Sequence, residues 1–111
     1  MNYSHLRRSV LSAAKEAFHG GLVSATAGNY SCFDPNLNVM AITPSGRGYE
    51  SMTEHDIVII TLEGQLVEGI HKPSSETPMH TMIYRKRPDI RGIAHTHSPY
   101  ATSFATLGRE I

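Results

Sequence analysis

The sequence predicts an α/β fold in which a central mixed or antiparallel sheet is flanked by helices. Apolar residues recur at helical spacing near the N-terminus, short β-branched runs follow, and turn-forming residues separate these runs at hairpin distances. The chain has 111 residues, of which 40% are hydrophobic and 18% charged. Such a composition is typical of a globular chain, and we expect one domain over residues 1–111.

The first expected elements are a helix and a hairpin. Apolar residues at helical spacing predict an amphipathic helix over residues 5–19, with Ser4 as its N-cap and two glycines after its end. Residues 29–33 and 39–42 are predicted strands, because the Asp-Pro-Asn turn at 34–36 lies between them. These elements place a helix before the first two strands of the sheet.

The second half continues with strands and helices. Residues 57–60 are Ile-Val-Ile-Ile, too apolar for an exposed strand, so we expect them to be central in the sheet. Residues 65–68 follow a tight turn as another short strand, and a helix is expected from about residue 76 to 86. A buried strand over 90–97 and a final helix over 99–107 complete the prediction.

Charge and cysteine content exclude several classes of protein. Ten Lys and Arg residues balance ten Asp and Glu residues, so no overall positive field is present to attract nucleic acid or an anionic membrane. No apolar run approaches the length of a membrane span. Cys32 is the only cysteine, which excludes an internal disulfide, fits a cytoplasmic location and favours a buried structural thiol.

The tripeptide His95-Thr96-His97 is the most informative for chemistry. It ends a predicted strand, where residues two apart project from the same face, so both imidazoles would point together. Neutral imidazole is a usual zinc ligand, and catalytic zinc commonly takes three protein ligands. The alternative, that one ring lies in the core and the other in solvent, stays open on spacing alone.

Glu76 and His80 lie one helical turn apart near the start of the predicted helix. A carboxylate is favoured at a helix N-terminus, so the simplest interpretation of Glu76 is a charge that stabilises the helix. For His80 we expect a structural or surface role. Neither position by itself predicts a catalytic site.

Three pairs of small residues are suited to binding an anion. Ser74 and Ser75 precede a helix whose backbone amides could hold an oxyanion, and Gly28-Asn29 and Ser45-Gly46 are turn-forming pairs. Turn geometry alone explains each pair equally well. Any site for phosphate would require several of them to converge.

Four motifs taken together are more specific. Thr26-Ala27-Gly28-Asn29, Ile42-Thr43-Pro44-Ser45-Gly46, Lys72-Pro73-Ser74-Ser75-Glu76 and Ala94-His95-Thr96-His97-Ser98 resemble, in order and spacing, the class II aldolase/adducin family. The resemblance covers nearly the whole chain. It implies that His95 and His97 are zinc ligands and that Glu76 is the acid/base carboxylate, which also approaches the metal. It further implies that the substrate phosphate is bound by Asn29, Ser45, Gly46, Ser74 and Ser75, with Thr43 nearby.

The resemblance also implies an activity. A zinc-dependent aldolase of the L-fuculose 1-phosphate type, cleaving a ketose phosphate into dihydroxyacetone phosphate and an aldehyde, is favoured because such aldolases carry glutamate at the position of Glu76. L-ribulose-5-phosphate 4-epimerases typically carry aspartate there, yet residues 72–80 and 95–98 resemble an epimerase at least as closely. The third hypothesis, an adducin-like interaction module without catalysis, is disfavoured by the retained histidines.

Chain length is the main departure from the resemblance. The resemblance implies relatives that are roughly twice as long, form tetramers with active sites between subunits, and supply a third histidine ligand and a catalytic tyrosine from a second half. We therefore expect this chain to be the N-terminal part of such a domain, with a weaker zinc site. Sheet edges normally covered would be exposed and would favour self-association.

Overall fold

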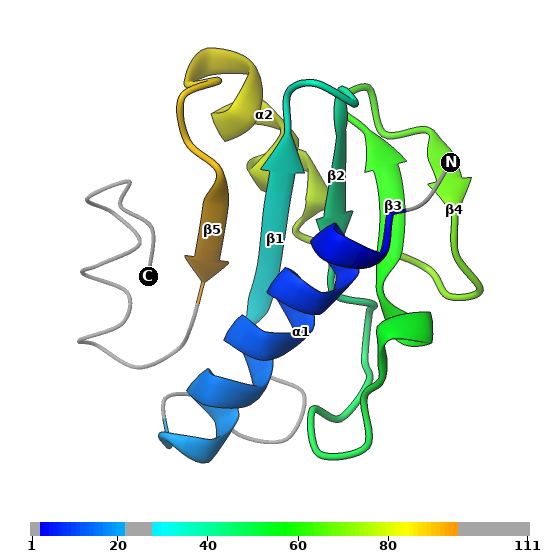
Figure 1. Ribbon diagram of the computed structural model, residues 1–111, viewed down its shortest axis with the longest axis vertical. Coiled ribbons are helices and arrows are strands. Elements are labelled where there is room, and N and C mark those ends of the chain that lie inside the picture. Colours follow the sequence, from blue (N-terminus) through cyan, green and yellow to red (C-terminus); the bar gives the residue numbers. More distant parts are fainter. Residues whose placement is uncertain (1–2, 22–27, 96–111) are drawn as a thin grey trace.

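The fold is built on an antiparallel five-stranded sheet with the strand order β4-β3-β2-β1-β5. A computed structural model describes residues 3–21 and 28–95 (Figure 1). The strands are β1 (Asn29–Asp34), β2 (Val39–Ile42), β3 (Val58–Thr61), β4 (Leu66–Glu68) and β5 (Gly92–His95). The helices are α1 (Ser4–His19), the 3₁₀ helix η1 (Glu54–Asp56) and α2 (Thr77–Lys86).

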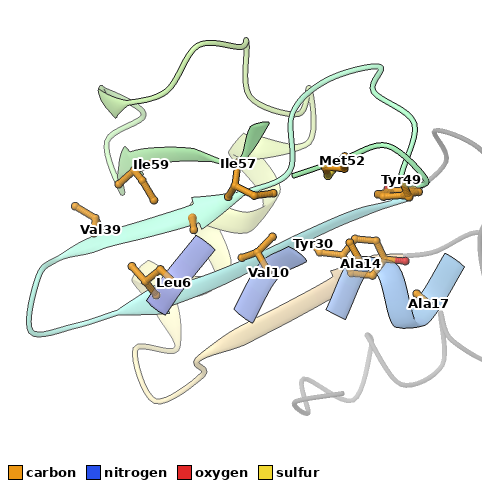
Figure 2. Packing of buried hydrophobic residues seen from close by; sticks show 11 residues of the cluster. Leu6, Val10, Ala14, Ala17, Tyr30, Val39, Tyr49, Met52, Ile57 and Ile59 are labelled. Carbon is orange, nitrogen blue, oxygen red and sulfur yellow. The ribbon is translucent and has the colours of Figure 1, made fainter. Parts of the chain in front are cut away.

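The two long helices cover opposite faces of the sheet (Figure 1). In the core under α1, Leu6, Val10 and Ala14 pack against alternate residues of the strands (Figure 2). The intervening strand residues face α2 and form a second core cluster with Tyr84. Because both faces are covered, β2 and β3 are apolar at successive positions instead of alternating.

Side-chain contacts fix the turns and hold α1 on the sheet. Asp34 Oδ1 accepts the backbone N–H of Asn36 at 2.9 Å and that of Leu37 at 3.3 Å, which closes the β1–β2 turn. Arg7 donates from Nε to the carbonyl of Ile57 at 3.2 Å and pairs with Glu68 on β4. These contacts join α1 to the edge of the sheet formed by β4.

Most predicted elements are confirmed, with boundary corrections. Ser4 is not the N-cap: Tyr3 occupies that position, because its carbonyl already accepts the N–H of Arg7 at 3.1 Å. The apolar strand begins at Val58, since the N–H of Ile57 bonds to Glu54 and closes η1. The helix after Lys72 begins at Thr77, one residue later than expected, and Glu76 is its N-cap.

The remaining expectations concern Cys32, the C-terminal elements and membrane-spanning segments. Cys32 was expected to be buried but is only partly buried, because it packs against the outside of the α1 core cluster. The last strand begins at Gly92 and is described as far as His95; its residues are partly buried and not buried as predicted, because β5 is an edge strand of the sheet. The helix expected over 99–107 lies outside the described residues. Within the described ranges, no helix is long and apolar enough to cross a membrane.

Candidate functional site

The predicted anion-binding residues lie at one end of the sheet. β1 begins there with Asn29, β2 ends there before Thr43, and β5 ends there with His95. Asn29 and His95 are direct partners in the β1–β5 register. Antiparallel pairing thus brings together residues that are 66 positions apart in the chain.

Backbone hydrogen bonds connect this end of the sheet to the segment before α2. Thr43 donates its N–H to the carbonyl of Tyr30 at 3.0 Å, and its Oγ1 accepts the N–H of Tyr30 at 3.2 Å. The carbonyl of Thr43 accepts the N–H of Ser74 at 3.0 Å, and Ser45 donates to the carbonyl of Lys72 at 2.9 Å. The 43–46 turn and the 72–76 segment are therefore held side by side.

Two glycines adopt a left-handed backbone conformation at this site. Gly28 has φ 87° and Gly46 has φ 67°, a left-handed conformation that other residues adopt only with strain. Tyr49 Oη donates to the carbonyl of Gly28 at 2.7 Å, and burial raises the pKa of Tyr49 to about 12, so the hydroxyl keeps its proton. This bond fixes the backbone directly before Asn29.

The start of α2 presents two serines and a carboxylate. Ser74 is buried and its Oγ accepts the N–H of Glu76 at 3.1 Å, while its carbonyl accepts the N–H of Thr77 at 3.1 Å. Ser75 is exposed and Glu76 is partly buried. Part of the binding capacity of Ser74 is thus used to begin the helix, and Ser75 is accessible to a ligand.

A buried polar network lies directly behind Asn29. His80 on α2 is fully buried, and its Nε2 donates to Asn29 Oδ1. Its Nδ1 lies 2.6 Å from Ser31 Oγ, which lies 2.7 Å from the Tyr84 hydroxyl. Of the two expected roles for His80, the structural one is confirmed and the surface one is wrong, because His80 faces the sheet.

The protonation of this network follows from its partners. A carboxamide oxygen only accepts, so Nε2 carries the proton, and a neutral ring then accepts at Nδ1 from the Ser31 hydroxyl. Burial, followed by the nearby His95, lowers the pKa of His80 to about 4. The ring is therefore neutral at physiological pH.

The structure describes part of the predicted metal site. Asn29 Nδ2 donates to His95 Nδ1 over 3.5 Å, and His95 is partly buried at the end of β5. His97 lies outside the described residues. In residues 3–21 and 28–95, no group of three or more His, Cys, Asp or Glu side chains could hold a metal ion.

The network residues Ser31, His80 and Tyr84 were missed as part of the site. Their local signal is a spacing: Asn29 and Ser31 are two apart on one strand, and His80 and Tyr84 are four apart on one helix. Each spacing puts a polar pair on a face that otherwise packs against apolar residues. That the His80 face of α2 packs on the Asn29 face of β1 is a tertiary contact, which local spacing does not predict.

Comparison with known proteins gives a consistent assignment. The sequence profile of the Class II Aldolase and Adducin N-terminal domain matches residues 8–111. A 5-deoxy-D-ribulose 1-phosphate aldolase of Bacillus thuringiensis serovar kurstaki is 44% identical over 105 residues, which are 95% of this chain and 49% of that protein.

Solved structures agree with the sequence match. An L-fuculose 1-phosphate aldolase superposes with a TM-score of 0.84 at 40% identity, over 96% of this chain and 50% of that one. YgbL of Klebsiella pneumoniae, described as a putative aldolase/epimerase/decarboxylase, gives a TM-score of 0.80 at 29% identity, over 93% of this chain and 49% of its own. The chain thus spans about half the length of these relatives.

Proposed function

The chain belongs to the class II aldolase and adducin family, and from this we propose that it acts as part of a metal-dependent sugar-phosphate aldolase. The proposed reaction is the reversible cleavage of a ketose 1-phosphate into dihydroxyacetone phosphate and an aldehyde. The observation that carries the proposal is the convergence of Asn29, Thr43, Ser74 and His95 at one end of the sheet. The substrates named for the aldolase relatives, 5-deoxyribulose and fuculose 1-phosphates, indicate the substrate class.

The substrate phosphate would bind between the 43–46 turn and the start of α2. Ser45 and Gly46 are exposed, and a Cβ added at Gly46 would meet no atom within 4 Å, so a ligand can approach the backbone there. Ser75 is exposed at the N-terminal end of a helix, where backbone amides favour an anion. Asn29 and Ser74 line the buried side, and Thr43 holds the strand beneath them.

The metal would be held by His95, His97 and Glu76. Imidazole and carboxylate both fit zinc, and His95 sits at the strand end that the Asn29 carboxamide approaches. Zinc bound there would supply Lewis-acid polarisation of the substrate carbonyl. Relatives are expected to add a third histidine and a tyrosine from the half that this chain does not match.

The described residues would supply substrate orientation and proton transfer. The carboxamide N–H of Asn29, the exposed Ser45 hydroxyl and the backbone N–H of Gly46 would orient the phosphate and substrate oxygens, because the N–H groups of Thr43 and Ser45 are already bonded to Tyr30 and Lys72. Glu76, at the N-cap of α2, would accept a proton from the substrate and return it to the carbon left electron-rich by C–C cleavage. Its partly buried position would shelter that transfer from bulk water.

Metal analysis tests the proposed centre. We expect the purified protein to bind zinc weakly or substoichiometrically, and the double variant His95→Ala/His97→Ala to lose the bound zinc. Elemental analysis after dialysis measures both. The matched control is His55→Ala, which removes an exposed histidine of η1 and should leave the zinc content unchanged. Equal zinc in the double variant and the wild type would contradict the proposal.

Product analysis tests the reaction. Ketose 1- and 5-phosphates, including fuculose and 5-deoxyribulose 1-phosphates, are incubated with this chain and with any longer form that the gene encodes. Release of dihydroxyacetone phosphate supports the aldolase, and Glu76→Gln should reduce kcat by about a hundredfold or more. Conversion of a 5-phosphate to its C4 epimer without release would support the epimerase alternative.

We also propose that the protein works as a homo-oligomer in the cytoplasm. The edge strand β4 and the residues after it expose apolar side chains, with Leu66 61% and Ile70 75% accessible. Covering such an edge by a second copy would remove unpaired backbone groups and apolar surface from water.

A further inference from the structure

We propose that His80 is a positioning residue that fixes the Asn29 carboxamide with its oxygen toward α2 and its N–H groups toward the substrate anion. The inference rests on the proposed function, because it assigns Asn29 to that anion site. His80 itself is fully buried, so a ligand at the site could not contact it. It would act only through the group it holds.

The hydrogen-bond inventory carries the first step. Asn29 has one acceptor oxygen, which His80 Nε2 occupies, and two N–H bonds on Nδ2. One N–H points to His95 Nδ1 over 3.5 Å. The other N–H can donate a hydrogen bond to a phosphate or substrate oxygen, so Asn29 would act as a donor toward the ligand.

The second step is what fixes His80. Ser31 Oγ has a single proton and donates it to Nδ1 at 2.6 Å, and the Tyr84 hydroxyl donates to Ser31 at 2.7 Å. The chain of donors therefore runs in one direction, from Tyr84 through Ser31 and His80 to Asn29. Reversal of any member would place two donors or two acceptors face to face in the core, at a cost of the order of 1–3 kcal/mol.

The third step separates this arrangement from ordinary core packing. A histidine that only filled space could be replaced by an apolar side chain of similar size without loss of function. His80 instead connects α2 to two positions of β1, Asn29 and Ser31, on the face that leads to the site. The amide orientation, and not the packing alone, depends on it.

Nitrogen NMR of the wild-type chain is the direct test. The protonated and bare nitrogens of a neutral imidazole have distinct ¹⁵N shifts, and His80→Gln identifies the signal among the seven histidines. We expect the Nε2–H tautomer at neutral pH. The Nδ1–H tautomer would require Asn29 to present its oxygen to the site and would overturn the proposal.

A double-mutant cycle with inorganic phosphate as the probe tests the functional consequence. Asn29→Ala and His80→Leu should each weaken phosphate binding by about tenfold or more, as expected for loss of a hydrogen bond to a charged ligand; leucine is used because glutamine could still donate to Asn29. In the Asn29→Ala background, His80→Leu should add no further loss, because His80 acts through Asn29. Additive losses would contradict the inference.

Thr81→Val is the matched control. Thr81 is buried beside His80 on α2 and its hydroxyl donates to the Pro78 carbonyl at 3.1 Å, so the change perturbs the same helix without touching Asn29. It should lower the melting temperature but leave phosphate affinity unchanged. An equal loss of affinity in Thr81→Val would assign the His80 effect to general destabilisation.

The failures of the two proposals have different signatures. A wild type that cleaves ketose phosphates but carries the Nδ1–H tautomer overturns the role of His80 alone. A wild type that binds no phosphate, with the Nε2–H tautomer intact, overturns the proposed phosphate site and the anion role of Asn29 with it. The tautomer is read in the unmodified protein, so a variant that fails to fold does not decide the outcome.

Discussion

Acidification should destabilise the fold through His80 before the carboxylates are protonated. His80 is fully buried, and burial lowers the pKa of its imidazole from 6.5 to about 4. Between these values the unfolded chain binds a proton at this position that the folded chain does not. The contribution of His80 to stability is therefore complete above the unfolded pKa and is lost progressively as the pH falls from the unfolded pKa to the folded one.

The magnitude follows from the separation of the two pKa values. At 1.4 kcal/mol per pH unit, acidification from about pH 6.5 to about pH 4 should remove roughly 3 kcal/mol of unfolding free energy. This is a large part of the roughly 5–15 kcal/mol typical of a domain. His80→Gln cannot titrate and should lack this component.

Urea unfolding of both proteins across this pH range makes the comparison. At neutral pH His80→Gln should be less stable by about 1–3 kcal/mol, because Asn29 or Ser31 loses a buried partner. The gap should close as the pH falls, since only the wild type loses the His80 contribution. Carboxylates titrate in both proteins, so their contributions cancel in the difference between the two unfolding free energies. A constant gap over the whole range would refute the reasoning, and His55→Gln, at an exposed position, should leave the wild-type profile unchanged.

Three further predictions concern other parts of the fold. The backbone N–H of Thr53, then His71, lowers the pKa of Asp56. Asp56→Asn should therefore cost about 1 kcal/mol in urea unfolding at neutral pH, as for a lost helix cap, and nothing once acid has protonated the carboxylate. Thr43→Val leaves the buried N–H of Tyr30 without its Oγ1 acceptor and should cost about 1–3 kcal/mol, whereas Thr43→Ser should retain most of the stability. Ile70→Lys should shift sedimentation toward smaller species while changing thermal stability by less than about 0.5 kcal/mol, and unchanged association would exclude this surface from the contact.

Much of the architecture could be predicted from local pattern. The strand Val39–Ile42 is found at its predicted limits. The apolar run 57–60 forms a strand with one residue of shift, and it lies next to the edge strand β4, while β2 is the central strand. Side-chain period and turn residues are local properties, so they are visible in the sequence. The helix start at Ser4 was missed because the carbonyl of Tyr3, and not a side chain, begins the hydrogen-bond ladder.

The site could be predicted only as separate pieces. Ser45-Gly46 and Ser74-Ser75 are each ordinary turn residues, and the bonds between Thr43 and Ser74 that join their segments are tertiary. The resemblance to a known family supplied the convergence that local spacing could not. It did not mark His80, which the sequence presents as one polar residue on a helix.

The two histidines nearest Asn29 show why residue type alone does not define a role. His80 and His95 both contact its carboxamide, from opposite sides. The buried ring of His80 has both nitrogens committed to protein partners, so it can only orient its neighbours. His95 is partly exposed at a strand end, where a ligand can approach. Asn29 therefore connects the buried network to the position of the proposed chemistry. A substitution in the buried network should change ligand binding at the accessible end of the sheet.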